Sequence, residues 1–157
     1  MSDSEKEGRF VVTHAESDSA VLKDVDDGQV HTLGSNPGVE EGDVLSATLA
    51  PDPPLEVTWQ VVEVETRRTV RIERSEEPPT TQERDIAAGQ DVGDLTREER
   101  AGKGEIHVLT VPPEETEDAV SDVLDDEATV VRAARMDEVN RVEVRARDGV
   151  VSVRYLP

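Results

Sequence analysis

Apolar and polar residues alternate along the first half of the chain with the period of two that is typical of β-strands. The alternating runs are short and are separated by turn-forming glycine, proline, asparagine and aspartate. Five or six short strands in one stretch are typical of a small closed or half-closed β-barrel, and we expect one of the OB type. The predicted strands are residues 9–14, 20–25, 29–33, 44–49, 56–65 and 69–74.

Turn residues also predict the pairing of the first hairpin. Asp27-Gly28 is a two-residue sequence typical of type I′ hairpins. Pairing across this turn sets Leu22 opposite Leu33 and Asp24 opposite His31.

A polar stretch after these strands predicts a helical connector. Thr80–Glu83 and Thr96–Glu99 both have the spacing of a helix capping box, with threonine first and glutamate fourth. Gly89 and Gly93 lie between the two boxes, and a glycine costs about 1 kcal/mol inside a helix. We therefore expect two short helices or one broken helix.

The C-terminus predicts a second hairpin, around the turn Asp148-Gly149. In its register Val144 faces Val153 on an apolar side, whereas Arg145 faces Ser152 on a polar side. We expect the apolar side to pack under helices, with Val144 buried.

The last third of the chain mixes both periods. A strand is predicted at residues 105–111, and two helices with apolar faces are predicted at 112–124 and 127–136. The whole pattern predicts an α+β protein with an N-terminal small OB-like β-barrel, a helical connector and a C-terminal two-layer α+β unit. The expected divisions are a disordered tail at residues 1–7, the barrel at 8–76, the connector at 77–103 and the α+β unit at 104–157.

The acidic composition indicates the setting of the protein. The chain has 37 acidic residues against 17 lysines and arginines, a formal net charge of -20 over 157 residues. Like charges repel over a Debye length of about 10 Å at 0.1 M salt, and this length falls to about 3 Å at 1 M. No apolar run approaches the roughly 18 residues of a membrane span, and the N-terminus has no signal-peptide pattern. We expect a halophilic, cytoplasmic protein without a membrane partner.

Residues suited to catalysis or metal binding do not gather in the sequence. His14, His31 and His107 lie on separate predicted strands, and the chain has no cysteine to complete a zinc site. Asp24–Gly28 lacks the spacing of a calcium loop, and no glycine-rich phosphate loop is present. We expect no catalytic residue, metal or cofactor, and we favour a protein that is not an enzyme. An enzyme with an unrecognised carboxylate site is a third hypothesis.

Arginines on the predicted sheets are the candidate contacts with a partner or a nucleic acid. Each phosphate contact loses affinity with salt, with a slope of about -0.9 in log units, so molar salt weakens such binding. Single-strand binders also stack bases on exposed aromatic rings, and this chain has only Phe10, Trp59 and Tyr155. Glutamates alternate with the arginines, which favours internal ion pairs. The candidates are Arg67, Arg68, Arg71 and Arg74 at the end of the barrel, and Arg145 and Arg147 on the C-terminal hairpin.

Four runs of the sequence resemble an uncharacterised family of haloarchaeal proteins, classed as a domain of unknown function. They are residues 8–14, 54–59, 107–118 and 150–157. The resemblance implies a halophilic setting and carries no activity, cofactor or site residue with it.

The leading hypothesis is a non-enzymatic cytoplasmic binding or adaptor protein with a protein partner, because the chain has a small-barrel pattern and no catalytic constellation. Separately, the rigid loop Pro51–Pro54 offers a short contact surface. The alternative is a nucleic-acid- or ribosome-associated protein that uses the arginine-rich sheet faces.

Overall fold

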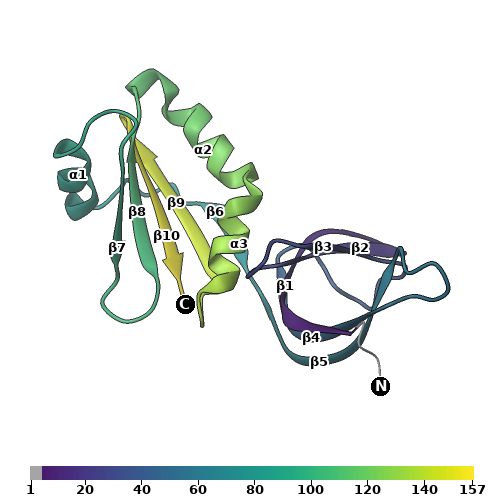
Figure 1. Ribbon diagram of the computed structural model, residues 1–157. Coiled ribbons are helices and arrows are strands. Elements are labelled where there is room, and N and C mark those ends of the chain that lie inside the picture. The colour runs from purple at the N-terminus through teal and green to yellow at the C-terminus, as the bar shows by residue number, and fades with distance from the viewer. Residues whose placement is uncertain (1–4) are drawn as a thin grey trace. The chain divides into compact units, whose positions relative to one another are not determined.

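The computed structural model describes residues 5–157, and the chain divides into two compact units between Val70 and Arg71. Each unit has its own β-sheet, and the described helices all belong to unit 2 (Figure 1). The α+β class predicted from the sequence is therefore confirmed. No helix within residues 5–157 has both the length and the apolar character needed to cross a lipid bilayer.

Unit 1 is a closed ring of five strands in the order β1-β2-β3-β5-β4, with β4 returning to β1. Neighbouring strands are antiparallel, except that β3 and β5 run parallel and meet only at Leu33 and Trp59. The strands are β1 (Lys6–Glu16), β2 (Ser19–Asp24), β3 (Val30–Leu33), β4 (Asp43–Pro51) and β5 (Trp59–Thr69).

Inward-facing side chains of alternating strand positions fill the ring. Phe10, Leu22, Leu45 and Leu49 are fully buried there, and Trp59 packs against their cluster. Trp59 is half-buried, so it lies at the border of this core. Burial of each such aliphatic side chain stabilises the fold by about 1.5–3 kcal/mol.

Strand β1 begins earlier than expected. Lys6 and Glu7, predicted to belong to a disordered tail, pair with Leu49 and Thr48 of β4. The rest of that predicted tail includes residues 1–4, which lie outside the described residues.

The first hairpin differs from the predicted register by two residues, because its turn is longer than two residues. Leu22 pairs with His31 rather than with Leu33. Asp24 closes the turn, since its Oδ1 accepts hydrogen bonds from the backbone N–H groups of Asp26 and Asp27, at 2.8 and 3.2 Å. A shift of two residues keeps every side chain on its predicted face.

Unit 2 is a five-stranded sheet in the order β6-β9-β10-β8-β7, with helices on both faces (Figure 1). Helices α2 and α3 pack over β9, whereas α1 lies over β8 and β10. Its elements are β6 (Arg71–Arg74), α1 (Thr81–Ala88), β7 (Leu95–Glu99), β8 (Glu105–Thr110), the 3-10 turn Pro113–Glu115, α2 (Thr116–Asp125), α3 (Glu127–Arg135), β9 (Arg141–Arg147) and β10 (Val150–Leu156).

Half of the predicted connector is a strand instead of a helix. The first capping box is present, with Thr80 and Glu83 each bonding the other's backbone N–H at the start of α1. The helix predicted at the second capping box is wrong, because Thr96–Glu99 lies in β7 and pairs with β8. Strand β6 also differs from prediction, since it pairs with β9 of unit 2 rather than with the ring. In both places long-range pairing overrides a local sequence pattern.

The C-terminal hairpin has the predicted register. Val144 pairs with Val153 and is fully buried, and Arg145 pairs with Ser152 on the other face. Helix α2 packs on β9 and β10, so the apolar side of the hairpin lies under helices as expected.

Candidate interaction surfaces

The four arginines predicted at the end of the barrel are divided between the units: Arg67 and Arg68 belong to unit 1, and Arg71 and Arg74 to unit 2. Arg67 Nη2 lies 2.6 Å from Asp43 Oδ2. The Asp43 side chain is fully buried, and Thr69 Oγ1 donates to its other oxygen at 2.7 Å. Arg67 therefore compensates a buried carboxylate, and Arg68 beside it is only half-buried.

Strand β6 carries the other two arginines of that predicted group. Arg74 forms a hydrogen-bonded ion pair with Glu117 of α2, and this bond lowers the pKa of the Glu117 carboxyl. Arg71 is exposed and pairs in the ladder with Arg141 of β9. Arg74 is thus used inside the unit, whereas Arg71 faces solvent.

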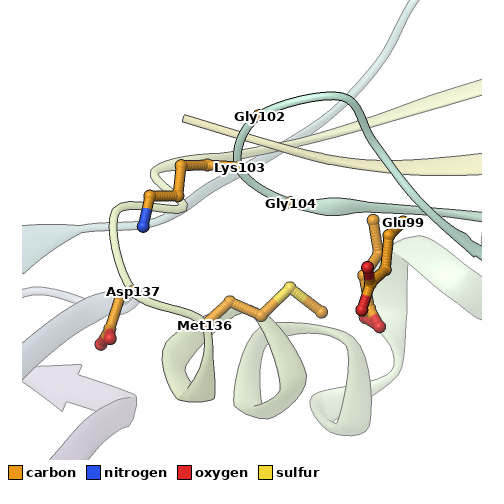
Figure 2. Close-up of a pocket in the computed structure, with 7 residues that line it drawn as sticks. Glu99, Gly102, Lys103, Gly104, Met136 and Asp137 are labelled. Atoms are coloured by element: carbon orange, nitrogen blue, oxygen red, sulfur yellow. The ribbon is translucent and has the colours of Figure 1, made fainter.

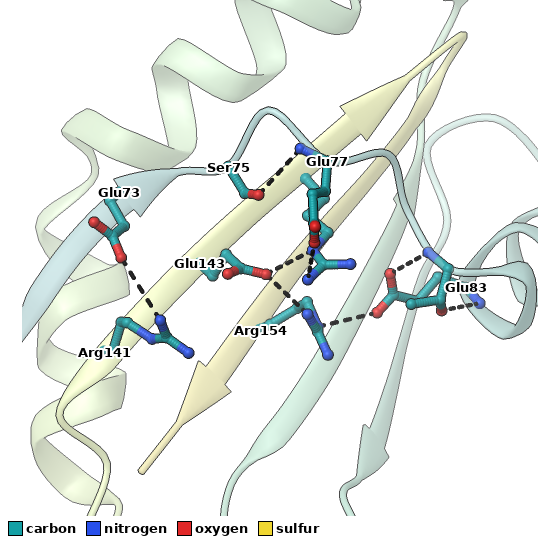
Figure 3. A network of polar contacts seen from close by, with 9 residues as sticks. Glu73, Ser75, Glu77, Glu83, Arg141, Glu143 and Arg154 are labelled. Carbon is teal, nitrogen blue, oxygen red and sulfur yellow. Dashed lines mark hydrogen bonds and ion pairs between the residues drawn. The ribbon is translucent and has the colours of Figure 1, made fainter.

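An ion-pair network lies beside α1, on the same face of the unit 2 sheet as that helix (Figure 3). Glu143 Oε1 accepts hydrogen bonds from Arg145 Nε at 2.6 Å and from Arg154 Nη1 at 2.8 Å. Arg145 also lies 3.0 Å from Glu77, and Arg154 Nε lies 3.4 Å from Glu83 Oε2. Burial by itself would raise the pKa of Glu143, but the bonds from the two arginines outweigh it and hold that pKa below its usual value. The network supports the interpretation of these arginines as internal ion pairs.

Arg147 differs from Arg145. It is exposed at the end of β9, and within residues 5–157 no carboxylate pairs with it or with Arg71. Of the six predicted contact residues, Arg71 and Arg147 alone are both exposed and without a carboxylate partner in the described part of the chain.

The aromatic residues offer little surface for stacking bases. Phe10 is fully buried and Tyr155 is 3% exposed. Trp59 is half-buried with its ring centroid 4.7 Å from that of His31 in an edge-to-face arrangement. The three aromatic rings therefore pack in or against the cores of the two units.

The three histidines lie far apart in sequence and on different strands, as expected. His31 is fully buried between Phe10 and Trp59, and neither of its ring nitrogens has a hydrogen-bond partner among residues 5–157. His107 is buried against Tyr155, with Nε2 3.4 Å from Glu105. Burial lowers the pKa of both rings. Among residues 5–157 no group of three or more metal-binding side chains is present.

A cavity of about 320 Å³ lies between the β7–β8 turn and the end of α3 (Figure 2). Its lining includes the turn Gly102–Gly104, Met136 and the three carboxylates of Glu99, Glu105 and Asp137. The one lysine of the lining, Lys103, lies 3.5 Å from Glu138. This acidic lining disfavours a phosphate.

The connection between β4 and β5 presents two apolar side chains to solvent. Leu55 is 77% exposed and Val57 is 73% exposed, and we call this pair the apolar tip. The base of the loop is braced, because Asp52 N–H donates to the Thr58 carbonyl at 2.8 Å and Thr58 Oγ1 donates to Asp52 Oδ2 at 2.9 Å. The proline pattern indicated this loop, but it gave no sign that its two apolar residues stay out of the core.

One comparison with known proteins gives a match. The model of a family of unknown function, DUF5812, matches residues 6–146. The chain belongs to this family. No curated protein and no solved structure matches the chain.

The match to DUF5812 spans both units. It runs from the start of β1 into β9, and so includes the apolar tip and the exposed Arg71. The family has no assigned activity, so a functional inference depends on the surfaces described above.

Proposed function

We propose that this DUF5812 protein is a non-enzymatic binding or adaptor protein that docks a protein partner on the apolar tip. The observation that carries this proposal is the exposure of Leu55 and Val57 on a braced loop of a highly charged chain. Burying one such side chain at an interface contributes about 1.5–3 kcal/mol. A loop held by its own hydrogen bonds loses little conformational entropy on binding.

The topology of unit 1 supports the proposal. The ring order β1-β2-β3-β5-β4, with β3 and β5 parallel, suits an OB-type barrel, which is our proposal for this unit. In OB folds the loop between the fourth and fifth strands is one of the binding loops. The apolar tip occupies that loop here.

The net charge of -20 supports a halophilic, cytoplasmic setting, which we propose together with a haloarchaeal origin. Molar salt screens ion pairs between partners, whereas salting-out conditions strengthen apolar contacts. An apolar docking residue therefore suits this setting better than a basic one.

The alternative function is association with a nucleic acid or the ribosome. Arg71 and Arg147 favour it, since both are exposed and unpaired with carboxylates in the described chain. The buried rings of Phe10 and Tyr155 count against it, because they leave only the half-buried Trp59 for stacking. Protein binding is therefore the better supported function.

The experiment that tests this is affinity copurification of the tagged full chain from native cells in about 2 M KCl, with and without nuclease. The variant L55S/V57S removes the apolar tip, and Val92→Ser is the matched control, since Val92 is 61% exposed in unit 2. We expect a protein partner that resists nuclease, is lost with L55S/V57S and is retained with Val92→Ser. Retention of the partner by L55S/V57S, or its loss on nuclease treatment, contradicts the proposal.

A further inference from the structure

His31 is a titratable side chain in an apolar position inside the ring of unit 1. It is fully buried, and its ring lies edge-to-face with Phe10 at a centroid distance of 5.5 Å and with Trp59 at 4.7 Å. Neither ring nitrogen has a hydrogen-bond partner among residues 5–157. An imidazolium carries two N–H donors and a charge, which this position does not solvate. Protonation of His31 therefore requires its ring to reach water.

The charged groups that act on His31 are already paired with one another. They are Lys6 on β1, Asp24 at the end of β2 and Asp27 in the turn that follows. Lys6 Nζ lies 2.7 Å from Asp27 Oδ2 and 3.4 Å from Asp24 Oδ2. From β5 the neighbour of the ring is the uncharged Trp59. Burial is the largest influence on the pKa of His31 and lowers it; Lys6 lowers this pKa further, and the opposing effects of Asp24 and Asp27 do not cancel the change.

The ring of unit 1 has its shortest ladder where β3 meets β5. Strand β3 forms four residue pairs with β2, but it pairs with β5 only at Leu33 and Trp59. A backbone hydrogen bond from Gly34 N–H to the Trp59 carbonyl, at 3.2 Å, adds to this contact. We call the contact of Leu33 and Gly34 with Trp59 the β3–β5 junction. His31 lies two residues before Leu33 on the same face of β3, so its ring reaches water with the least loss of strand pairing by opening this junction.

The base of the apolar tip packs on the same junction. A Cβ atom on Gly34 would lie 3.1 Å from Asp52 Oδ2 and 3.2 Å from Thr58 Oγ1. These two oxygens form the hydrogen bond that braces the base of the loop. Thr58 also directly precedes Trp59, so a displacement of Trp59 moves one half of the brace. The apolar tip therefore depends on the β3–β5 junction for its support.

We propose that the β3–β5 junction is a pH-sensitive switch: protonation of His31 opens it, displaces Trp59 and frees the base of the apolar tip, so that the partner dissociates in mild acid. This inference rests on the proposed function of the tip as a docking site. A loop without its brace loses more conformational entropy when it binds, so its affinity falls. Molar salt leaves the switch active, because mobile ions screen a buried charge much less than an exposed one.

The first test uses Trp59, the one tryptophan of the chain, as a reporter of the junction. In about 2 M KCl the emission maximum of the wild-type chain should shift reversibly to longer wavelength between about pH 7.5 and 5, with a midpoint below about 6.5. Quenching by acrylamide should increase over the same range. His31→Gln and His31→Phe both remove the titrating group and should abolish the two changes. His14→Gln, at an exposed position on β1, is the matched control and should keep them.

Far-UV circular dichroism of the same samples separates an open junction from an unfolded ring. The spectrum should stay unchanged over this pH range, because the other ladders of the ring remain paired. An emission maximum that does not respond to pH in the wild-type chain overturns the proposal. A response that persists in both His31 variants, or that coincides with loss of the dichroism signal, overturns it as well.

The second test follows the link from the junction to the tip, by affinity copurification in about 2 M KCl. A partner captured by the tagged full chain at about pH 7.5 should be released by a wash at about pH 5. His31→Gln should retain the partner in that wash, whereas His14→Gln should release it as the wild-type chain does. Retention by the wild-type chain, or equal release from His31→Gln, overturns the link. The fluorescence test needs no partner, so the switch and the proposed function fail separately.

Discussion

The carboxylate of Glu83 is 1% exposed and lies 3.4 Å from Arg154 Nε. Its Oε1 also accepts a hydrogen bond from the backbone N–H of Thr80, at 2.9 Å, so one buried side chain both caps α1 and attaches the helix to β10.

This ion pair predicts that substituting Arg154 and substituting Glu83 lower the stability of the fold by different amounts. Arg154→Met should lower the free energy of unfolding by about 2–4 kcal/mol, because it leaves Glu83 charged, buried and without its partner. Glu83→Gln keeps a capping side chain and should cost about 1 kcal/mol. Urea denaturation in high salt measures both.

The double variant R154M/E83Q is the control. It should be less destabilised than the sum of the single variants, because removing the charge removes the reason for the penalty. Additive costs would show that the two groups do not interact.

The C-terminal hairpin predicts a second pair of effects. Val144→Ala should destabilise by about 1–3 kcal/mol, since it leaves a cavity under α2. Arg145→Ser should cost about 0.5–1.5 kcal/mol, because Arg145 is 15% exposed and paired with Glu143, which keeps Arg154 as a second partner. Denaturation midpoints of the two variants give the order, and a larger cost for Arg145→Ser would contradict it.

The buried histidines predict a loss of stability on mild acidification. Burial lowers the folded-state pKa of His31 and His107 below the unfolded value of about 6.5. Between those values the unfolded chain binds more protons than the folded one. The stability that the two neutral buried rings contribute is therefore fully present above about pH 6.5. It is lost as the pH falls towards their folded-state pKa.

Chemical denaturation between about pH 7.5 and 5.5 checks this, because most carboxylates titrate below that range. The slope of unfolding free energy against pH should become shallower in His31→Gln and in His107→Gln. His14→Gln, at an exposed position, is the matched control. An unchanged slope in both buried-site variants would contradict the prediction.

The net charge predicts that the fold depends on salt. Between about 0.1 and 2 M KCl the thermal midpoint should rise by about 10 °C or more, as screening removes repulsion among 37 acidic residues. Sulfate should raise it further, since it also strengthens apolar burial. A midpoint that is insensitive to KCl would contradict the halophilic setting.

The sequence predicted contacts that depend on short-range pattern. The register of Val144 with Val153 follows from a two-residue turn and strict alternation, and the cap at Thr80 follows from its own spacing. The hairpin at Asp27-Gly28 was wrong by two residues, because Asp24 lengthens the turn through side-chain bonds that compete with the expected geometry.

Short-range patterns did not reveal which segments far apart in the sequence pair as strands. Thr96–Glu99 has a helix-start spacing, yet β8 supplies a ladder that favours a strand. For the candidate surfaces, the sequence named Arg147 but could not separate it from the internally paired Arg145. The sequence also did not indicate that Leu55 and Val57 lie outside the core, because an apolar residue type alone does not distinguish a buried position from an exposed one.

The position of β9 and β10 has a consequence for synthesis on the ribosome. These two strands lie inside the unit 2 sheet, yet they are the last of its five strands to be made. Strand β6 pairs with β9 in the sheet. It therefore stays unpaired until most of unit 2 has been translated. Unit 1, by contrast, has all five of its strands by Val70. A chain truncated before Arg141 should therefore keep a folded ring followed by an unfolded segment, a substrate for cellular proteases.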